Sequence, residues 1–193
     1  MSNLSSPVTS TREQLLHEAS RMLLKKGLSG FSLQELATSL NLKKASLFHH
    51  FSSKGALALE LYRFYQRSFT EWVRRHEALS PEKQILAYAD ELTRWICEKQ
   101  RVCPVGALSL EWQQVPKDLQ EEILKLHELQ KTWLTHLFRQ IQKTQGLSLP
   151  VKDAVLGTMG LLQGSIQLAR LNNDPTLVRK NLKSYLKSIR KNS

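Results

Sequence analysis

The chain has 193 residues, of which 28 are lysine or arginine and 17 are aspartate or glutamate, so its formal net charge is +11. A hydrophobic fraction of 41% and a charged fraction of 23% are typical of a folded globular protein and exclude an intrinsically disordered chain. The basic excess favours an anionic partner, nucleic acid before an acidic membrane surface, and a basic surface that serves only solubility is the alternative.

Membrane and disulfide-rich classes are also excluded. Residues 1–10 have neither the basic nor the apolar region of a signal peptide. The longest uncharged stretch, Ala154–Ala169, is 16 residues long and contains several polar side chains, too few apolar residues to span a bilayer. Cys97 and Cys103 are too few for a disulfide scaffold, and their spacing fits no zinc motif. We expect a cytoplasmic protein with no metal, no cofactor and no membrane partner.

Apolar residues recur at helical spacing throughout, which predicts an all-α fold of about nine helices after a disordered tail over residues 1–10. The first helix is expected to start at Thr11 as its N-cap and to end at Gly27. The second starts at Ser32, which has capping-box spacing to Glu35. Asn41, a residue that tolerates left-handed backbone, predicts a tight turn before a third helix over residues 43–49.

Serines and prolines mark the remaining helix starts. The pair at 52–53 is expected to cap a long fourth helix that ends near Glu77. A proline stands at the start of each later helix, and the expected ranges are 81–100, a short helix from 104, 116–146, 150–172 and 175–191.

Residues 32–51 match the helix-turn-helix plan: two short amphipathic helices joined by a tight turn, with the small Ala37 where they cross. In the second of these helices, Lys43 and Lys44 suit phosphates, whereas Ser46 and His49 can bond base edges or phosphates. Phe48 can contact a thymine methyl group. A plain helical hairpin is the alternative interpretation of the spacing.

This segment closely resembles the DNA-binding region of the TetR family of bacterial transcriptional regulators. The resemblance is specific over residues 11–62 and is carried by Gly27, Phe31, Leu36-Ala37, Ser46-Leu47-Phe48, His50-Phe51, Lys54 and Leu57. The chain departs from the family pattern at the turn residue Asn41, usually glycine, at Phe48, usually tyrosine, and at Gly55, usually glutamate. Phe48 lacks the hydroxyl that in this family often contacts a phosphate.

The resemblance implies a DNA-binding domain over residues 11–53 and a ligand-binding and dimerisation domain over residues 54–193. Lys54 at a helix start is expected to bind a phosphate. The full set of expected DNA-contacting residues is Thr11, Ser32, Gln34, Lys43, Lys44, Ser46, Phe48, His49 and Lys54.

The resemblance further implies a small-molecule pocket among the middle helices and a homodimer through the last two. Aromatic and polar residues are the pocket candidates: Tyr62, Gln66, Phe69, Trp95, Trp112, Trp133, Met159 and Gln163. An ordinary aromatic core is the alternative. The expected dimer residues are Gly157, Gly160, Gly164, Leu182, Tyr185, Leu186 and Ile189, with packing inside one chain as the alternative.

We therefore expect a homodimeric repressor that a small apolar or aromatic effector releases from a palindromic operator in double-stranded DNA. One alternative is a sensor of electrophiles or oxidants on the same scaffold, with Cys97 and Cys103 as its redox residues, since Cys103-Pro104 stands at a helix start and the segment resembles a Cys-x-x-Gly subset of the family. Two buried structural cysteines are the other interpretation of these residues. Another is an activator or architectural protein that needs no ligand. An enzyme is excluded because the sequence has no paired carboxylates in a convincing setting, no G-x-S-x-G, no H-E-x-x-H and no phosphate-binding glycine loop.

The charge is concentrated at the two ends of the chain. Residues 1–54 carry seven basic and three acidic side chains, and residues 175–193 carry six basic and no acidic ones. The N-terminal excess agrees with DNA as the partner, whereas the C-terminal excess has no account in the sequence.

Overall fold

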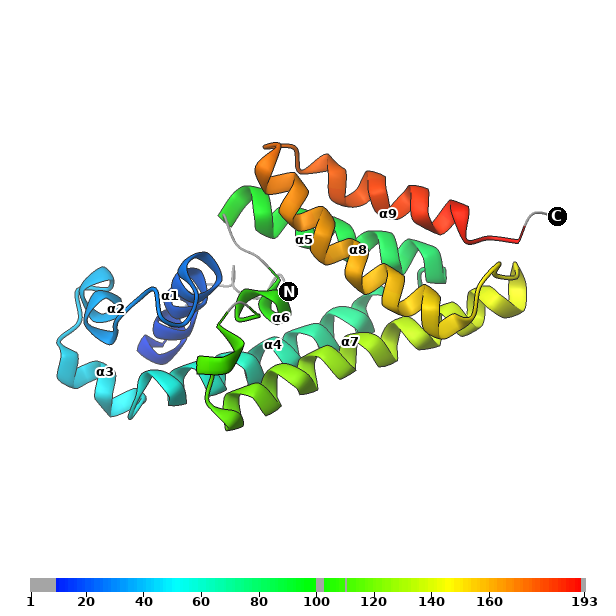
Figure 1. The fold of residues 1–193 in the computed structure, drawn as a ribbon. Helices are drawn as coiled ribbons and strands as arrows, with labels where there is room; N and C mark the ends of the chain where they lie inside the picture. The colour runs from blue at the N-terminus through cyan, green and yellow to red at the C-terminus, as the bar shows by residue number, and fades with distance from the viewer. Residues whose placement is uncertain (1–9, 100–102, 110, 192–193) are drawn as a thin grey trace. The chain divides into compact units, whose positions relative to one another are not determined.

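The computed structural model describes residues 10–99, 103–109 and 111–191, with side chains from residue 95 to residue 99 left out. Apart from one isolated bridge between Leu147 and Arg190, the regular elements in these ranges are helices, which confirms the all-α prediction. The helices are α1 Thr11–Lys26, α2 Leu33–Ser39, α3 Lys44–His50, α4 Lys54–His76, α5 Pro81–Lys99, α6 Pro104–Ala107, η2 Trp112–Gln114, α7 Lys117–Thr144, α8 Val151–Leu171 and α9 Thr176–Ser188 (Figure 1). None of the described helices is long and apolar enough to cross a membrane.

The chain divides into two compact units. The first consists of Met1–Trp72 and Pro104–Leu126, and the second of Val73–Cys103 and His127–Ser193. Helices α4 and α7 each begin in the first unit and end in the second. The predicted domain limits at residues 11–53 and 54–193 remain a proposal about function.

In the first unit, the start of α1 differs from the expectation by one residue. Ser10, not Thr11, is the N-cap: its hydroxyl accepts the backbone N–H of Glu13, and the Glu13 carboxylate accepts the N–H of Ser10. The pair Ser10 and Glu13, three residues apart, satisfies two backbone N–H groups at the helix start. The pair Thr11 and Gln14 does not form such a capping box here. Gly27 ends the helix with a φ of 77°, as predicted.

The helix-turn-helix forms as the sequence predicts. Ser32 and Glu35 make a complete capping box at the start of α2. Asn41 takes a φ of 53° in the turn, and Ala37 is fully buried beneath it. Leu36 from α2 and Leu47 from α3 are also fully buried, so the two helices share one small core.

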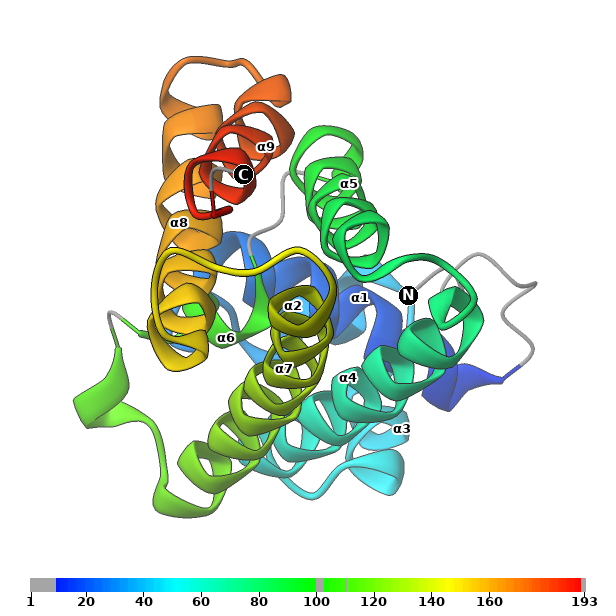
Figure 2. The same cartoon turned by 90° about the vertical axis from the view of Figure 1, so that its right-hand side faces the viewer.

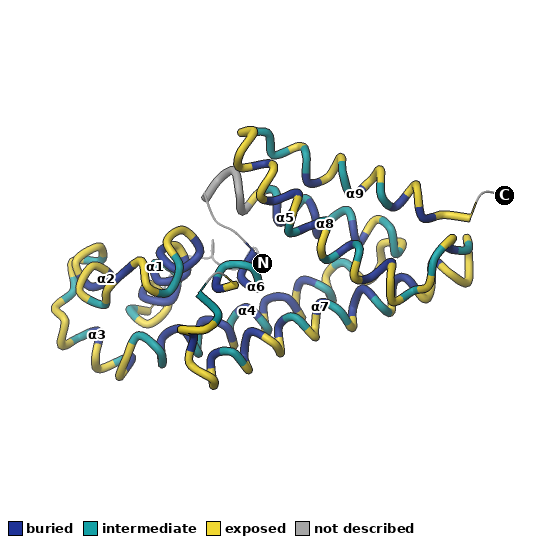
Figure 3. The backbone as a smooth tube through the Cα atoms, in the orientation of Figure 1, coloured by how far each residue is buried: buried dark blue, intermediate teal, exposed yellow. Residues whose placement is uncertain are grey.

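In the second unit, α9 lies alongside α8 and α5 in both views (Figures 1 and 2). One side of α9 is buried and the other is exposed (Figure 3). The helix ends at Ser188, earlier than the predicted 191, because the Ile189 carbonyl accepts the N–H of Ser148 and Arg190 joins the bridge to Leu147.

The buried side of α9 includes residues that the sequence assigned to a dimer interface. Leu182, Leu186 and Ile189 are at most 5% exposed in the single chain. Tyr185 packs on Gly157, where an added Cβ would lie 2.1 Å from the tyrosine oxygen. Leu182, Leu186 and Ile189 thus pack within one chain, whereas Tyr185 and Gly157 are half-buried, and their place in a subunit contact stays a prediction.

Candidate nucleic-acid interface

Helix α3 presents a polar and basic surface opposite its buried anchor. Leu47 is fully buried, whereas Lys43, Lys44, Phe48 and His49 are exposed. Ser46 is half-buried on the same short helix. The structure thus brings all five residues that the sequence proposed for the recognition helix to one element, with the side chains outside the core.

Phe48 is the exposed aromatic residue of this surface. Its side chain is 43% exposed, and the Lys44 ammonium lies 5.7 Å from the ring centroid. Burying so exposed a ring against a partner is favourable, and a nearby cation suits a partner that is anionic and carries apolar edges. A DNA groove, with thymine methyl groups between phosphates, has both properties.

The outer candidates Thr11, Ser32 and Gln34 stand at helix starts. Thr11 is the first residue of α1 and is half-buried. The Ser32 hydroxyl accepts the N–H of Glu35 at 3.0 Å but remains exposed. The Gln34 amide is exposed and lies 3.5 Å from the Thr38 hydroxyl.

Lys54 has a contact that the sequence did not predict. Its ammonium donates to the carbonyl of Leu28 at 2.8 Å and to that of Phe31 at 2.9 Å, and it lies 5.2 Å from the centre of the Phe31 ring. Two of its three donors are therefore used inside the protein. We leave Lys54 out of the proposed phosphate contacts, because binding a phosphate would compete with these bonds.

The α1–α2 connection, Gly27–Phe31, is held from its other side by Glu111. The N–H groups of Leu28 and Ser29 each donate to the Glu111 carboxylate at 2.8 Å. A Cβ on Gly27 would lie 2.0 Å from the nearer carboxylate oxygen, so the close approach depends on glycine. Burial opposes the ionisation of Glu111, but the bonds from Ser29 and Leu28 and the charge of Lys54 outweigh it and lower its pKa.

Sequence reasoning missed Glu111 as a residue that shapes the interface. It lies 83 positions from Leu28, and no local pattern connects the two. Arg12 was missed as well: it pairs with Glu60 of α4 at 3.2 Å, and its guanidinium lies 5.5 Å from the centre of the Phe51 ring. These contacts hold α1 against α4 and against Phe51, the residue that directly follows α3.

The pocket candidates of the first unit make internal contacts. The buried Tyr62 hydroxyl donates to the Pro104 carbonyl at 2.7 Å, and Phe69 stacks on Trp72. Trp112 is half-buried in η2, a short helix that the sequence did not predict. A role of these residues toward a ligand stays a prediction.

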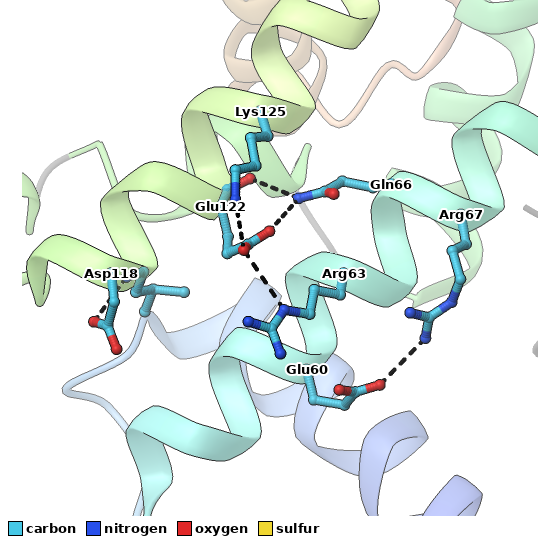
Figure 4. Close-up of polar contacts among 8 residues, drawn as sticks. Glu60, Arg63, Gln66, Arg67, Asp118, Glu122 and Lys125 are labelled. Atoms are coloured by element: carbon cyan, nitrogen blue, oxygen red, sulfur yellow. Dashed lines mark hydrogen bonds and ion pairs between the residues drawn. The ribbon is translucent and has the colours of Figure 1, made fainter.

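Gln66 belongs to a polar network between α4 and α7 (Figure 4). Its amide donates to the Glu122 carboxylate at 2.8 Å and to the Glu122 carbonyl at 3.0 Å. Lys125 lies 3.0 Å and Arg63 3.5 Å from the same carboxylate. Burial opposes the ionisation of Glu122, but these partners, Gln66 foremost, lower its pKa. The network joins the two helices within the first unit.

In the second unit, Trp133 belongs to a buried aromatic and amide cluster. The rings of Tyr88 and Trp133 meet edge to face with centroids 5.4 Å apart, and the Gln130 amide donates to the Tyr88 hydroxyl at 2.8 Å. Burial, followed by the nearby Cys103 and Glu91, raises the pKa of Tyr88 well above its usual range. We call Tyr88, Gln130 and Trp133 the aromatic cluster.

The remaining candidates are on α8, at Cys103 or outside the described part of the chain. Met159 and Gln163 are half-buried on α8. Cys103 is only 3% exposed. The side chains of Trp95 and Cys97 fall outside the described residues.

Comparison with known proteins agrees with this geometry. The sequence profile of the family described as "Bacterial regulatory proteins, tetR family" matches residues 15–61, which cover most of α1 and all of α2 and α3. The HTH-type transcriptional repressor NemR of Escherichia coli is 28% identical over 117 residues, or 58% of this chain and 57% of NemR. The matched region therefore spans little more than half the length of that relative. An uncharacterized HTH-type transcriptional regulator of Lactococcus lactis is 23% identical over 182 residues, or 89% of each chain.

Solved structures share the fold over nearly the whole chain. A TetR family transcriptional regulator from Agrobacterium tumefaciens has a TM-score of 0.84 at 21% identity and covers 93% of this chain and 97% of its own. The transcriptional regulator FadR of Bacillus subtilis, solved in complex with stearoyl-CoA, has a TM-score of 0.70 at 13% identity and covers 91% and 98%.

Proposed function

This chain belongs to the TetR family of bacterial regulatory proteins, whose members are transcriptional regulators and not enzymes, and on that premise we propose that it represses transcription in the bacterial cytoplasm. It binds a palindromic operator as a homodimer, with one α3 helix in each of two successive major grooves. A small-molecule effector releases it. The exposed face of α3 is the observation that carries this proposal.

Each residue of α3 has a distinct role in the proposed complex. Lys43 and Lys44, exposed at the start of the helix, neutralise phosphates on either side of the groove. Ser46 and His49 bond base edges, and Phe48 packs on a thymine methyl group. Thr11, Ser32 and Gln34 position the domain through further phosphate contacts.

Binding to duplexes selected from a random library tests this assignment. Lys44→Ala should weaken binding to selected and random duplexes alike and make the slope of log K against log salt shallower by about 1.8, the contribution of two phosphate contacts, one from each subunit. His49→Ala should instead relax the base preference at one position of each half-site, at about 1–3 kcal/mol.

The exposed Lys143 of α7 supplies the matched control, since Lys143→Ala removes one charge outside α3. It should leave both affinity and salt slope unchanged. The proposal fails if no duplex is enriched, or if the two lysine variants have the same slope.

The exposed stripe of α8, defined by Leu156, Gly160, Gly164, Leu168 and Leu171, supports the dimer. Its three leucines are 47–83% exposed, although leucine is usually buried. A Cβ added at Gly160 or Gly164 would meet nothing within 4 Å, so a second helix has room to approach closely. We assign this stripe, in place of the buried face of α9, to the contact with a second copy of the chain.

The aromatic cluster of the second unit supports an effector with an apolar or aromatic body. It combines two aromatic faces with a hydroxyl and an amide, the mixture that small-molecule sites use. Stearoyl-CoA bound to FadR, named above, is a ligand of this kind on the same fold.

A thermal-shift screen of the full chain tests the effector. A true effector raises the melting temperature by linkage, and by reciprocity it also lowers the affinity for the selected duplex. If no compound does both, the alternative of a ligand-independent DNA-binding protein is favoured instead.

A further inference from the structure

The cations of α9, with Arg190 just after it, fall into two classes, which the sequence alone does not distinguish. Arg179 pairs with Asp90 of α5, and Arg190 pairs with Glu82 of α5 at 3.0 Å. The pKa of Asp174 is lowered first by hydrogen bonds from Thr176 and then by the charge of Lys180, which therefore lies near that carboxyl. Among the described residues, Lys183 and Lys187 make no ion pair within 4.0 Å of a carboxylate.

These two lysines line a groove in the second unit. The groove has a volume of about 360 Å³ and is bounded by residues of α5 and by the face of α9 beside it: Glu82, Leu86, Lys183, Ser184, Leu186, Lys187 and Arg190. Lys183 and Lys187 are four residues apart, so their ammonium groups lie on the same side of the helix. Two like charges held together without a counter-ion raise the local positive potential.

The groove is not uniformly polar. Leu186 is only 5% exposed, and Leu86 is half-buried, so apolar surface lies beneath the lysines. The only acidic lining residue, Glu82, is already paired with Arg190. A ligand that satisfies this lining has an anionic head for the lysines and the Ser184 hydroxyl, and a compact apolar body for the leucines.

We propose that the groove between α5 and α9 binds a small organic anion, a carboxylate or phosphate on an aromatic or short aliphatic body. The volume is within the range of small-molecule sites, at its lower end. The site lies entirely in the second unit, contains no residue of α3 or of the aromatic cluster, and does not depend on the proposed DNA binding. It also accounts for part of the basic excess at the C-terminal end of the chain.

Calorimetric titration of the full chain with phenyl phosphate at low ionic strength tests the site. We expect Lys183→Gln with Lys187→Gln to weaken binding at least tenfold. The control, Lys180→Gln with Lys191→Gln, removes the same charge from residues that do not line the groove and should change affinity less than threefold. All four positions are exposed, so circular dichroism should show each double variant folded.

Further probes separate the head from the body. Inorganic phosphate should bind more weakly than phenyl phosphate, and Leu86→Ser should weaken only the aromatic probe. Benzoate in the same titration shows whether a carboxylate or a phosphate is the preferred head, and tight binding of either supports the site.

Three results would overturn the proposal. The first is an equal loss in the two double variants, which indicates diffuse attraction. The second is an affinity for inorganic phosphate equal to that for phenyl phosphate. The third is loss of duplex DNA binding in Lys183→Gln with Lys187→Gln while phenyl phosphate does not bind, which makes this face a nucleic-acid contact.

Discussion

Glu111 is the residue through which the segment after α6 holds the α1–α2 connection. Its carboxylate accepts two backbone N–H groups from that connection, and Lys54 holds two of the carbonyls. Because α2 follows directly, these bonds help set the position of the helix-turn-helix within the first unit. The arrangement depends on charge at Glu111 and on the absence of a side chain at Gly27.

Glu111→Gln should lower the free energy of unfolding at pH 7 by about 1–2 kcal/mol, because the two N–H groups donate to different carboxylate oxygens and an amide keeps only one acceptor oxygen. The pKa of Glu111 is lowered in the folded state. The ionised Glu111 therefore adds its full share to the free energy of unfolding at any pH above the ordinary carboxyl pKa of about 4.3. This stabilisation is lost as the pH falls through the lower pKa of the folded state.

Urea unfolding at pH 7 and at pH 3 measures this difference, which should be large at the first pH and small at the second. The exposed Glu121 provides the control, and Glu121→Gln should change stability by less than about 0.5 kcal/mol. A gap between Glu111→Gln and the natural chain that does not narrow in acid would contradict the assigned role of the charge.

Gly27→Ala should destabilise the first unit by more than about 1–2 kcal/mol, the usual cost of a left-handed alanine, because its Cβ also meets the Glu111 carboxylate. Gly55→Ala is the matched comparison. It lies in the first turn of α4, where the nearest atom is 3.6 Å away, and should stabilise the chain by about 0.5–1 kcal/mol. Thermal unfolding of the two variants should therefore move in opposite directions.

At the scale of elements, α9 is a core helix whose outer face is charged. Val178, Leu182, Leu186 and Ile189 are buried against α5 and α8, and two arginines add ion pairs to α5. The helix is thus held in place by its buried apolar residues and by the ion pairs that the two arginines form with α5. Its stability belongs to the single chain.

Leu182→Ala should cost about 2–5 kcal/mol of unfolding free energy, as for other fully buried leucines. Leu124→Ala, at a residue of α7 that is 49% exposed and lies outside the α8 stripe, should cost less than about 0.5 kcal/mol. Urea unfolding at two protein concentrations provides the check: the Leu182 deficit should be the same at both. If the loss of unfolding free energy in Leu182→Ala is larger at the lower protein concentration, Leu182 lies in a subunit interface.

Helix limits were predictable from the sequence where the signal is local. The Ser32–Glu35 capping box, Asn41 and Gly27 each act within a few residues, and each lies where it was expected. The contacts of Lys54 and Glu111 join segments 26 and 83 positions apart, and no local pattern reports them. The apolar stripe of α9 was visible, but periodicity does not identify the surface that covers it.

At the scale of the whole molecule, the proposed dimer depends on the exposed stripe of α8. Leu156→Asp should weaken dimerisation by about a hundredfold or more, because it places an unpaired charge in an apolar interface. It should weaken operator binding as well, because a monomer has one α3 helix and therefore binds only one half-site. Sedimentation velocity and titration with the selected duplex measure the two effects.

Leu79→Asp is the control for that change. Leu79 is another exposed leucine of the second unit, at 39%, but it lies between α4 and α5. This variant should sediment as the natural chain does. If both aspartate variants remain dimeric, the stripe is not the subunit contact.

Two of the three boundaries between the compact units fall inside helices, at Trp72 in α4 and at Leu126 in α7, and the third, after Cys103, comes directly before α6. A helix is cooperative along its length, so no break inside α4 or α7 leaves both halves intact. Anyone who exchanges sensing modules between such regulators to make a chimera should therefore join the genes in the short turn at Ser52–Ser53, before α4 begins. A junction at Trp72 would follow the units but would splice two unrelated sequences into the middle of one helix.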